Sequence, residues 1–69
     1  MTIVKTEIVV VSLDTTYQIP GDWTSAQVVA NYAASIQGLA AMQVEESIET
    51  RDEGQVKVLT FHPKVGGKG

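Results

Sequence analysis

Cysteine is absent from this 69-residue chain. The absence excludes disulfide bonds and zinc sites built on thiolates, so the fold must depend on packing alone or on a partner. Histidine occurs once, at His62, and has no cysteine or second histidine that could share a catalytic role with it. We therefore expect His62 to be structural or solvent-exposed. We expect no catalytic residue, no metal and no cofactor.

Basic residues are also scarce, and the formal net charge is -3. Nucleic-acid binding needs clustered lysine or arginine. The basic residues of this chain are instead scattered, at Lys5, Arg51, Lys57, Lys64 and Lys68. Long apolar runs are missing as well, since a run such as Ile8 to Val11 is far too short to cross a bilayer. We expect no nucleic-acid partner, no membrane span and, in the absence of a signal-peptide pattern, a cytoplasmic protein.

The length gives room for one domain with one small core. Hydrophobic residues make up 43% of the chain and charged residues 19%, as in ordinary globular domains. We expect a single domain over residues 1–64 and a flexible glycine-rich tail over residues 65–69.

The first part of the chain predicts a β-hairpin. Residues 2–13 are rich in β-branched side chains, and their unbroken run at Ile8 to Val11 is typical of a strand inside a sheet. Asp14-Thr15-Thr16 indicates a turn, and Tyr17 to Ile19 a short return strand. The alternation leaves open which face of the first strand meets the core.

A helix is expected from about Ser25 to Gln37. Thr24 and Gln27 have the spacing of a capping box, in which each side chain bonds the other residue's backbone amide. Trp23 and Val28 have the spacing of a hydrophobic staple. An apolar stripe follows at three- and four-residue steps, and Gly38 supplies a left-handed end.

The last part predicts a second hairpin. Met42, Val44 and Ile48 alternate with polar residues, as in a strand with one buried face. Residues 51–54 form the loop, and residues 55–61 form an apolar last strand. The expected fold is therefore α+β in the order β-β-α-β-β, with a single helix packed across a four-stranded mixed sheet. Its two most apolar strands, the first and the last, would be parallel neighbours in the middle.

Three segments carry a family resemblance. They are the helix pattern of residues 24–34, the strand end Leu59-Thr60-Phe61, and the terminus of residues 65–69. Together with length and element order, they resemble the PRTRC system protein C family, a short prokaryotic ubiquitin-like family with the β-grasp fold. The likeness extends from about Ile8 to Gly69 and rests on this combination, because no single motif is specific.

The resemblance implies a bacterial ubiquitin-like modifier or carrier of a mobile-element system. Its partners would be an E1-like (ThiF-type) adenylating enzyme and a JAB-type metalloprotease, and it would be their substrate. The tail that these enzymes would recognise is Val65, Gly66, Gly67, Lys68 and Gly69. Gly66-Gly67 is followed here by Lys68-Gly69, so the reactive end is Gly67 after trimming, or Gly69 itself, or the chain is not conjugated.

The alternative function is that of a non-conjugated β-grasp protein-protein interaction module. It would bind its partner through an exposed sheet face or by adding a strand at a sheet edge. An acidic cluster lies on the second hairpin, at Glu45, Glu46, Glu49, Asp52 and Glu53. We expect it to be a solvated face that discourages aggregation, because the spacing of a calcium loop is absent.

Overall fold

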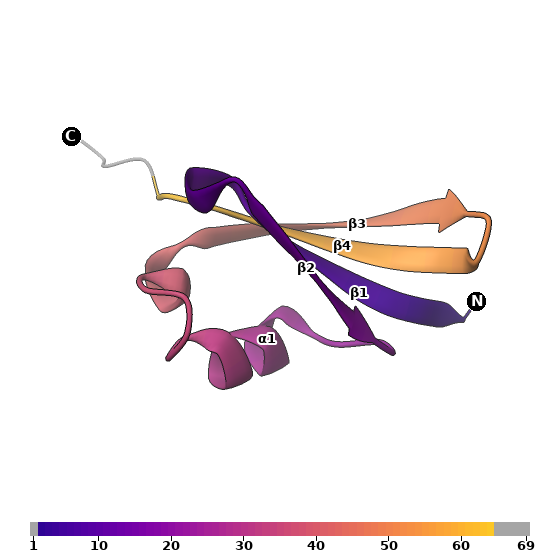
Figure 1. The fold of residues 1–69 in the computed structure, drawn as a ribbon, viewed down its shortest axis with the longest axis horizontal. Helices are drawn as coiled ribbons and strands as arrows, with labels where there is room; N and C mark the ends of the chain where they lie inside the picture. The colour runs from indigo at the N-terminus through magenta and orange to yellow at the C-terminus, as the bar shows by residue number, and fades with distance from the viewer. Residues whose placement is uncertain (1, 65–69) are drawn as a thin grey trace.

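The computed structural model describes residues 2–64. Its elements are β1 (Ile3–Val10), the 3₁₀ turn η1 (Val11–Leu13), β2 (Thr15–Pro20), α1 (Ser25–Tyr32), the 3₁₀ turn η2 (Leu39–Ala41), β3 (Gln43–Arg51) and β4 (Gly54–His62). The four strands form one mixed sheet, and α1 lies across one face of it (Figure 1). The predictions of an α+β fold with one α-helix and a four-stranded mixed sheet are thus confirmed for the described residues.

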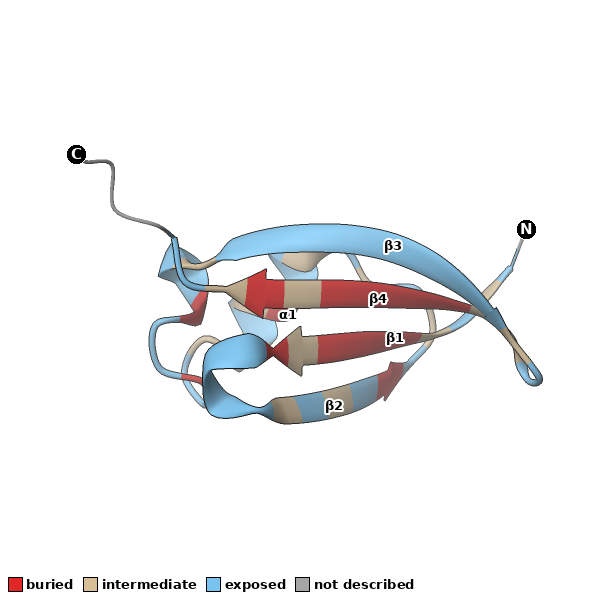
Figure 2. Cartoon of the chain, turned by 90° about the horizontal axis from the view of Figure 1, so that it is seen from above, coloured by how far each residue is buried: buried red, intermediate tan, exposed pale blue. Residues whose placement is uncertain are grey.

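The strands lie in the order β2-β1-β4-β3, so β1 and β4 are central. They run parallel, while β2 and β3 pair antiparallel on the outside. Both central strands are mostly buried, whereas the outer strands are mostly exposed (Figure 2). The predicted parallel central pair is therefore present, because only β1 and β4 carry enough apolar residues to be covered on both faces.

The first hairpin differs from its prediction. The strand ends at Val10 rather than Leu13, and residues 11–13 turn back as η1. Asp14 closes this turn with a φ of 51°, a left-handed conformation that aspartate tolerates. The Thr15 hydroxyl then donates a hydrogen bond of 2.8 Å to the Leu13 carbonyl. Val11 and Leu13 are left exposed by this turn.

The core lies between the sheet and α1. The register resolves the question left open for β1, because Ile8 and Val10 pair with Leu59 and Phe61 of β4 and are buried with them. The remaining members of this core cluster are Ile19, Val28, Ile36 and Leu39. Side chains from the first hairpin, from the segment between β2 and β3, and from β4 thus form one core.

The start of α1 follows its prediction and the end does not. Thr24 and Gln27 make the predicted capping box, with bonds of 2.9 and 3.1 Å between side chains and backbone amides. The helix ends at Tyr32, five residues before Gln37. Beyond it, the amides of both Ser35 and Ile36 donate to the Tyr32 carbonyl, so the regular helical pattern is lost. This irregular turn brings Ile36 into the core, and Gly38 follows with the expected left-handed φ of 80°.

The predicted buried face of the third strand is wrong. Val44 and Ile48 lie on the side of α1, but they keep 38% and 40% of their surface exposed. The strand lies at the edge of the sheet, and the hairpin of β3 and β4 extends beyond the short helix (Figure 1). An apolar alternation indicates a face but not whether another element covers that face.

Candidate functional site: the open sheet face, the β3 edge and the approach to the C-terminus

The residues predicted to form the tail lie outside the described residues. They are Val65, Gly66, Gly67, Lys68 and Gly69. The strand that precedes them is described in full. β4 runs between β1 and β3 to His62, and Leu59 and Phe61 near its end are buried. The chain therefore leaves a central, firmly packed strand only a few residues before Val65.

The sheet face opposite α1 carries two buried valines beneath a layer of polar side chains. Val56 and Val58 of β4 are 0% and 6% exposed, although α1 lies on the other face. The register places Val56 between Lys5 and Glu49, and Val58 between Glu7 and Ser47. Long charged side chains cover apolar surface with their methylene groups while their charged ends stay near water. The polar side chains therefore stabilise the fold by covering the two valines. They also form the solvent-facing surface on this side of the sheet.

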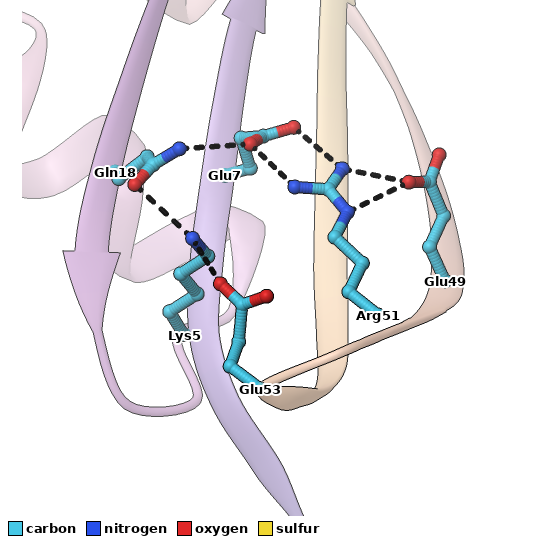
Figure 3. Close-up of polar contacts among 6 residues, drawn as sticks. All are labelled: Lys5, Glu7, Gln18, Glu49, Arg51 and Glu53. Atoms are coloured by element: carbon cyan, nitrogen blue, oxygen red, sulfur yellow. Dashed lines mark hydrogen bonds and ion pairs between the residues drawn. The ribbon is translucent and has the colours of Figure 1, made fainter.

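Glu7 and Arg51 are the centre of this layer (Figure 3). The Arg51 guanidinium binds both Glu7 carboxylate oxygens, at 2.9 and 3.0 Å. The same guanidinium donates to Glu49 at 2.6 and 3.1 Å. A planar guanidinium that binds a carboxylate through two parallel bonds is geometrically specific. These contacts join β1 directly to the C-terminal end of β3, across the intervening β4.

Two further bonds extend the layer to the other edge of the sheet. Gln18 of β2 donates from its side-chain amide to Glu7 at 3.1 Å and accepts from Lys5 at 3.2 Å. Lys5 in turn pairs with Glu53 of the second hairpin turn at 2.7 Å. Side chains of β1, β2, β3 and the second hairpin turn are thus connected on this face (Figure 3).

The layer shifts the ionisation of its carboxylates. The hydrogen bonds from Arg51 are the main cause that holds the pKa of the Glu7 carboxyl below its ordinary value, although burial acts in the opposite direction. The hydrogen bond from Lys5 likewise lowers the pKa of Glu53. The pKa of Arg51 is raised, chiefly by its bonds to Glu7 and then by those to Glu49. All three groups are therefore held in their charged forms near neutral pH.

The five acidic residues of the second hairpin do not form one site. Glu49 binds Arg51, and Glu53 binds Lys5. The register places Glu46 on the α1 side of β3, away from Glu45 and Glu49. Within residues 2–64, no three histidine, cysteine or acidic side chains are grouped closely enough to hold a metal ion. All five acidic residues are exposed, as expected of a solvated hairpin surface.

A second polar group lies on the α1 side, and sequence reasoning missed it. Lys57 of β4 is mostly buried, and its Nζ lies 2.5 Å from Asp22 and 3.2 Å from the Trp23 carbonyl. The buried Thr6 hydroxyl donates to the Gly21 carbonyl at 2.8 Å and accepts from the Trp23 amide at 2.9 Å. These bonds hold the segment before α1 against the central strands. The sequence signal for these buried polar contacts was the presence of polar residues within apolar strands, as at Thr6, Glu7 and Lys57.

His62 and the aromatic residues take structural positions. The His62 side chain is partly buried at the end of β4, and its Nε2 lies 3.8 Å from Glu45. Trp23 and Tyr32 pack against the core, with ring centroids 6.4 Å apart in an edge-to-face arrangement. Tyr17 packs on Tyr32 from the sheet side, at 6.2 Å. Trp23 is thus partly buried at the helix start rather than a free anchor on the surface.

Comparison of the chain with protein-family models, curated proteins and solved structures gives no match. No helix within residues 2–64 is long and apolar enough to cross a membrane. The surface of residues 2–64 also has no pocket. The surfaces described above, together with the position of β4, are therefore the structural basis for a functional proposal.

Proposed function

We propose that this chain is a ubiquitin-like modifier or carrier protein of the PRTRC system protein C type, with a β-grasp fold. It acts as a substrate of an E1-like adenylating enzyme and a JAB-type protease, and it has no catalytic site of its own. The proposal rests on the sequence resemblance and on one structural observation. That observation is the central position of β4, which ends at His62 shortly before the glycine-rich terminus.

The position of β4 supports the proposal for a physical reason. A terminus that enters an enzyme channel must be narrow, and glycine lacks the side chain that would block entry. The segment before it must be rigid, so that the enzyme can recognise the domain and the end together. β4 meets this requirement, because it is paired on both sides and its core residues are fully buried.

The test is an activation assay with ATP and an E1-like adenylating enzyme encoded beside the gene. Adenylation joins the C-terminal carboxylate to AMP and releases pyrophosphate, and mass spectrometry detects the adduct. Activation of the intact chain would assign the reactive end to Gly69. Activation only after treatment with the JAB-type protease, with loss of Lys68-Gly69, would assign it to Gly67.

A chain with an amidated C-terminus is the matched control, because it differs only in the carboxylate. Without the protease, its incubation with the adenylating enzyme and ATP should release no pyrophosphate. The proposal fails if neither the intact nor the trimmed chain is activated while the adenylating enzyme is active on another substrate.

The second candidate is a non-conjugated interaction module, and the uncovered β3 edge favours it. Within residues 2–64, β3 pairs only with β4, and all its residues except Arg51 are exposed. Such a module would keep its partner when the chain is shortened to end at Lys64. A modifier shortened in the same way would lose both its enzymes.

A further inference from the structure

The two edges of the sheet differ in how well they are protected. An edge strand leaves every second backbone N–H and C=O without a partner, and short strands, proline, lysine or a bulge block the approach of another strand. β2 has six residues and ends in Pro20. β3 has nine residues without proline or lysine, and its pairing with β4 shows no register shift from Gln43 to Arg51. β3 is therefore the edge that can accept a further strand.

The two faces of β3 present different side chains to such a strand. On the α1 side, the half-exposed Val44 and Ile48 flank Glu46, because these three residues lie opposite Phe61, Lys57 and Leu59 of β4. On the other side, Glu45 and Glu49 flank Ser47. Directly opposite side chains on paired strands interact, and like charges there are unfavourable. A complementary strand therefore carries apolar residues opposite Val44 and Ile48, and basic residues opposite the glutamates.

We propose that the β3 edge binds an extended basic segment of a partner protein by strand addition. The backbone of the segment continues the sheet beyond β3. One of its lysine or arginine side chains meets Glu46 between two apolar contacts, and another meets Glu45 on the opposite face. Strand addition supplies affinity through the main chain and specificity through alternate side chains. Because the glutamates are negatively charged, they favour a partner segment that is positively charged.

A second copy of this chain fits the edge less well. An antiparallel pair of β3 strands centred on Ser47 places Glu45 opposite Glu49 twice. A pair centred on Glu46 places that residue opposite itself. Only the pair centred on Ile48 brings Glu45 opposite Arg51, and the Arg51 guanidinium is already held by Glu7 and Glu49. The charge pattern thus opposes self-association and favours a basic partner.

This docking site deepens the second candidate function and does not depend on the first. It uses no residue beyond the sheet, so a failed activation assay would leave it standing. Conversely, failure of the binding experiment below would not affect activation of the C-terminus. The two proposals are therefore tested separately.

The experiment is a titration of the full chain with a capped peptide of eight residues, followed by NMR of the backbone amides. The peptide contains threonine, valine and lysine, arranged so that the valines meet Val44 and Ile48 and the lysines meet Glu45 and Glu46. We expect shift changes concentrated in β3 and slower hydrogen exchange of its outward amides. A peptide of the same composition in scrambled order should bind at least tenfold more weakly. A peptide with alternate amides methylated, which removes main-chain donors, should bind weakly as well.

The variant Glu46→Lys should weaken binding of the ordered peptide by at least tenfold, which is about 1.4 kcal/mol. Asp14→Lys is the control, because it makes the same charge change in the exposed turn before β2. It should leave binding within about twofold, apart from the general effect of net charge that salt screens. Circular dichroism of both variants verifies that they fold.

Four results would overturn the inference. The first is no shift change at millimolar peptide. The second is a set of shifts over β2 or the open sheet face. The third is equal binding of the ordered and the methylated peptides. The fourth is a dimer in sedimentation experiments that Glu46→Lys changes, which would make a second copy the occupant of this edge.

Discussion

Glu7 shows how a single residue can unite the sheet. Its side chain lies on a central strand with only 12% of its surface exposed, and it accepts bonds from Arg51 and Gln18. A buried carboxylate is unfavourable unless it is paired and hydrogen-bonded. Here the partners come from both outer strands, so the charge is satisfied only when all four strands are assembled. The ionisation of the Glu7 carboxyl is therefore linked to the stability of the whole sheet.

This coupling makes the stability dependent on pH. The folded-state pKa of Glu7 is lowered, so its contribution is complete above the unfolded value near 4.5 and is lost as the pH falls through the folded-state value. The variant Glu7→Gln keeps the shape but lacks the charge. We expect it to lower the free energy of unfolding by about 1–3 kcal/mol at pH 7. We also expect its stability to fall less steeply than that of the wild type below pH 4.5.

Urea denaturation at pH 7 and at several acid values measures both effects. Glu46→Gln is the control, because it removes one exposed carboxylate on the other face of the sheet. It should leave the stability at pH 7 within about 0.5 kcal/mol. Equal acid sensitivity of Glu7→Gln and the wild type would contradict this role for Glu7.

At the scale of the element, α1 is short and depends on its first turn. An α-helix of eight residues is not stable in isolation, so capping and packing must both support it. The capping box satisfies two amides at the N-terminus, and Val28 is the helix residue that is fully buried. Loss of the cap should therefore lower the stability of the whole domain and not only fray the end of the helix.

We expect Thr24→Ala to reduce the free energy of unfolding by about 1 kcal/mol. Thr24→Ser retains the hydroxyl and should retain most of the stability. The midpoint of urea unfolding, measured for both variants under the same conditions, distinguishes them. If the two variants lose the same amount, the hydroxyl bond to the Gln27 amide is not the stabilising interaction.

The second hairpin is the other element whose behaviour follows from its position. Gly54 has a φ of 131°, and a Cβ placed there would lie 3.0 Å from Val4 Cγ1. The hairpin is thus anchored to β1 at its tip, while the middle of β3 is uncovered. An element that is fixed at one end and open along its edge is suited to accept a strand without rearrangement.

At the scale of the whole molecule, stability rests on one small core. A domain of this length buries only about 60% of its unfolded surface. Such a core supplies no more than about 3–5 kcal/mol of net stability. The fully buried Leu59 lies on β4, which pairs with β1 and β3. Its side chain is on the face of the sheet that packs against α1. Because there is no second core, the stability lost through a cavity at this position is not offset elsewhere in the described domain.

We expect Leu59→Ala to cost about 2–5 kcal/mol, enough to unfold much of the population at 25 °C. Val11→Ala, at an exposed position in η1, should change stability by less than about 0.5 kcal/mol. Thermal unfolding followed by circular dichroism compares the two. A cooperative transition for Leu59→Ala near that of the wild type would contradict the dependence of stability on this core.

The features that the sequence determined by itself are those whose cause is local. Thr24 and Gln27 are three residues apart, so the capping box needs only the first turn of α1. Gly38 adopts its left-handed conformation because it lacks a side chain. The two central strands followed from their apolar composition, since only they could be covered on both faces.

Tertiary structure decided everything that depends on distant neighbours. Glu7 and Arg51 are 44 positions apart, and only the sheet order brings them together across β4. The early end of α1 depends on how Ile36 reaches the core, and the exposure of Val44 and Ile48 depends on where that helix ends. The same alternation would describe a buried or an open strand, because periodicity records which side chains share a face and not what lies against them.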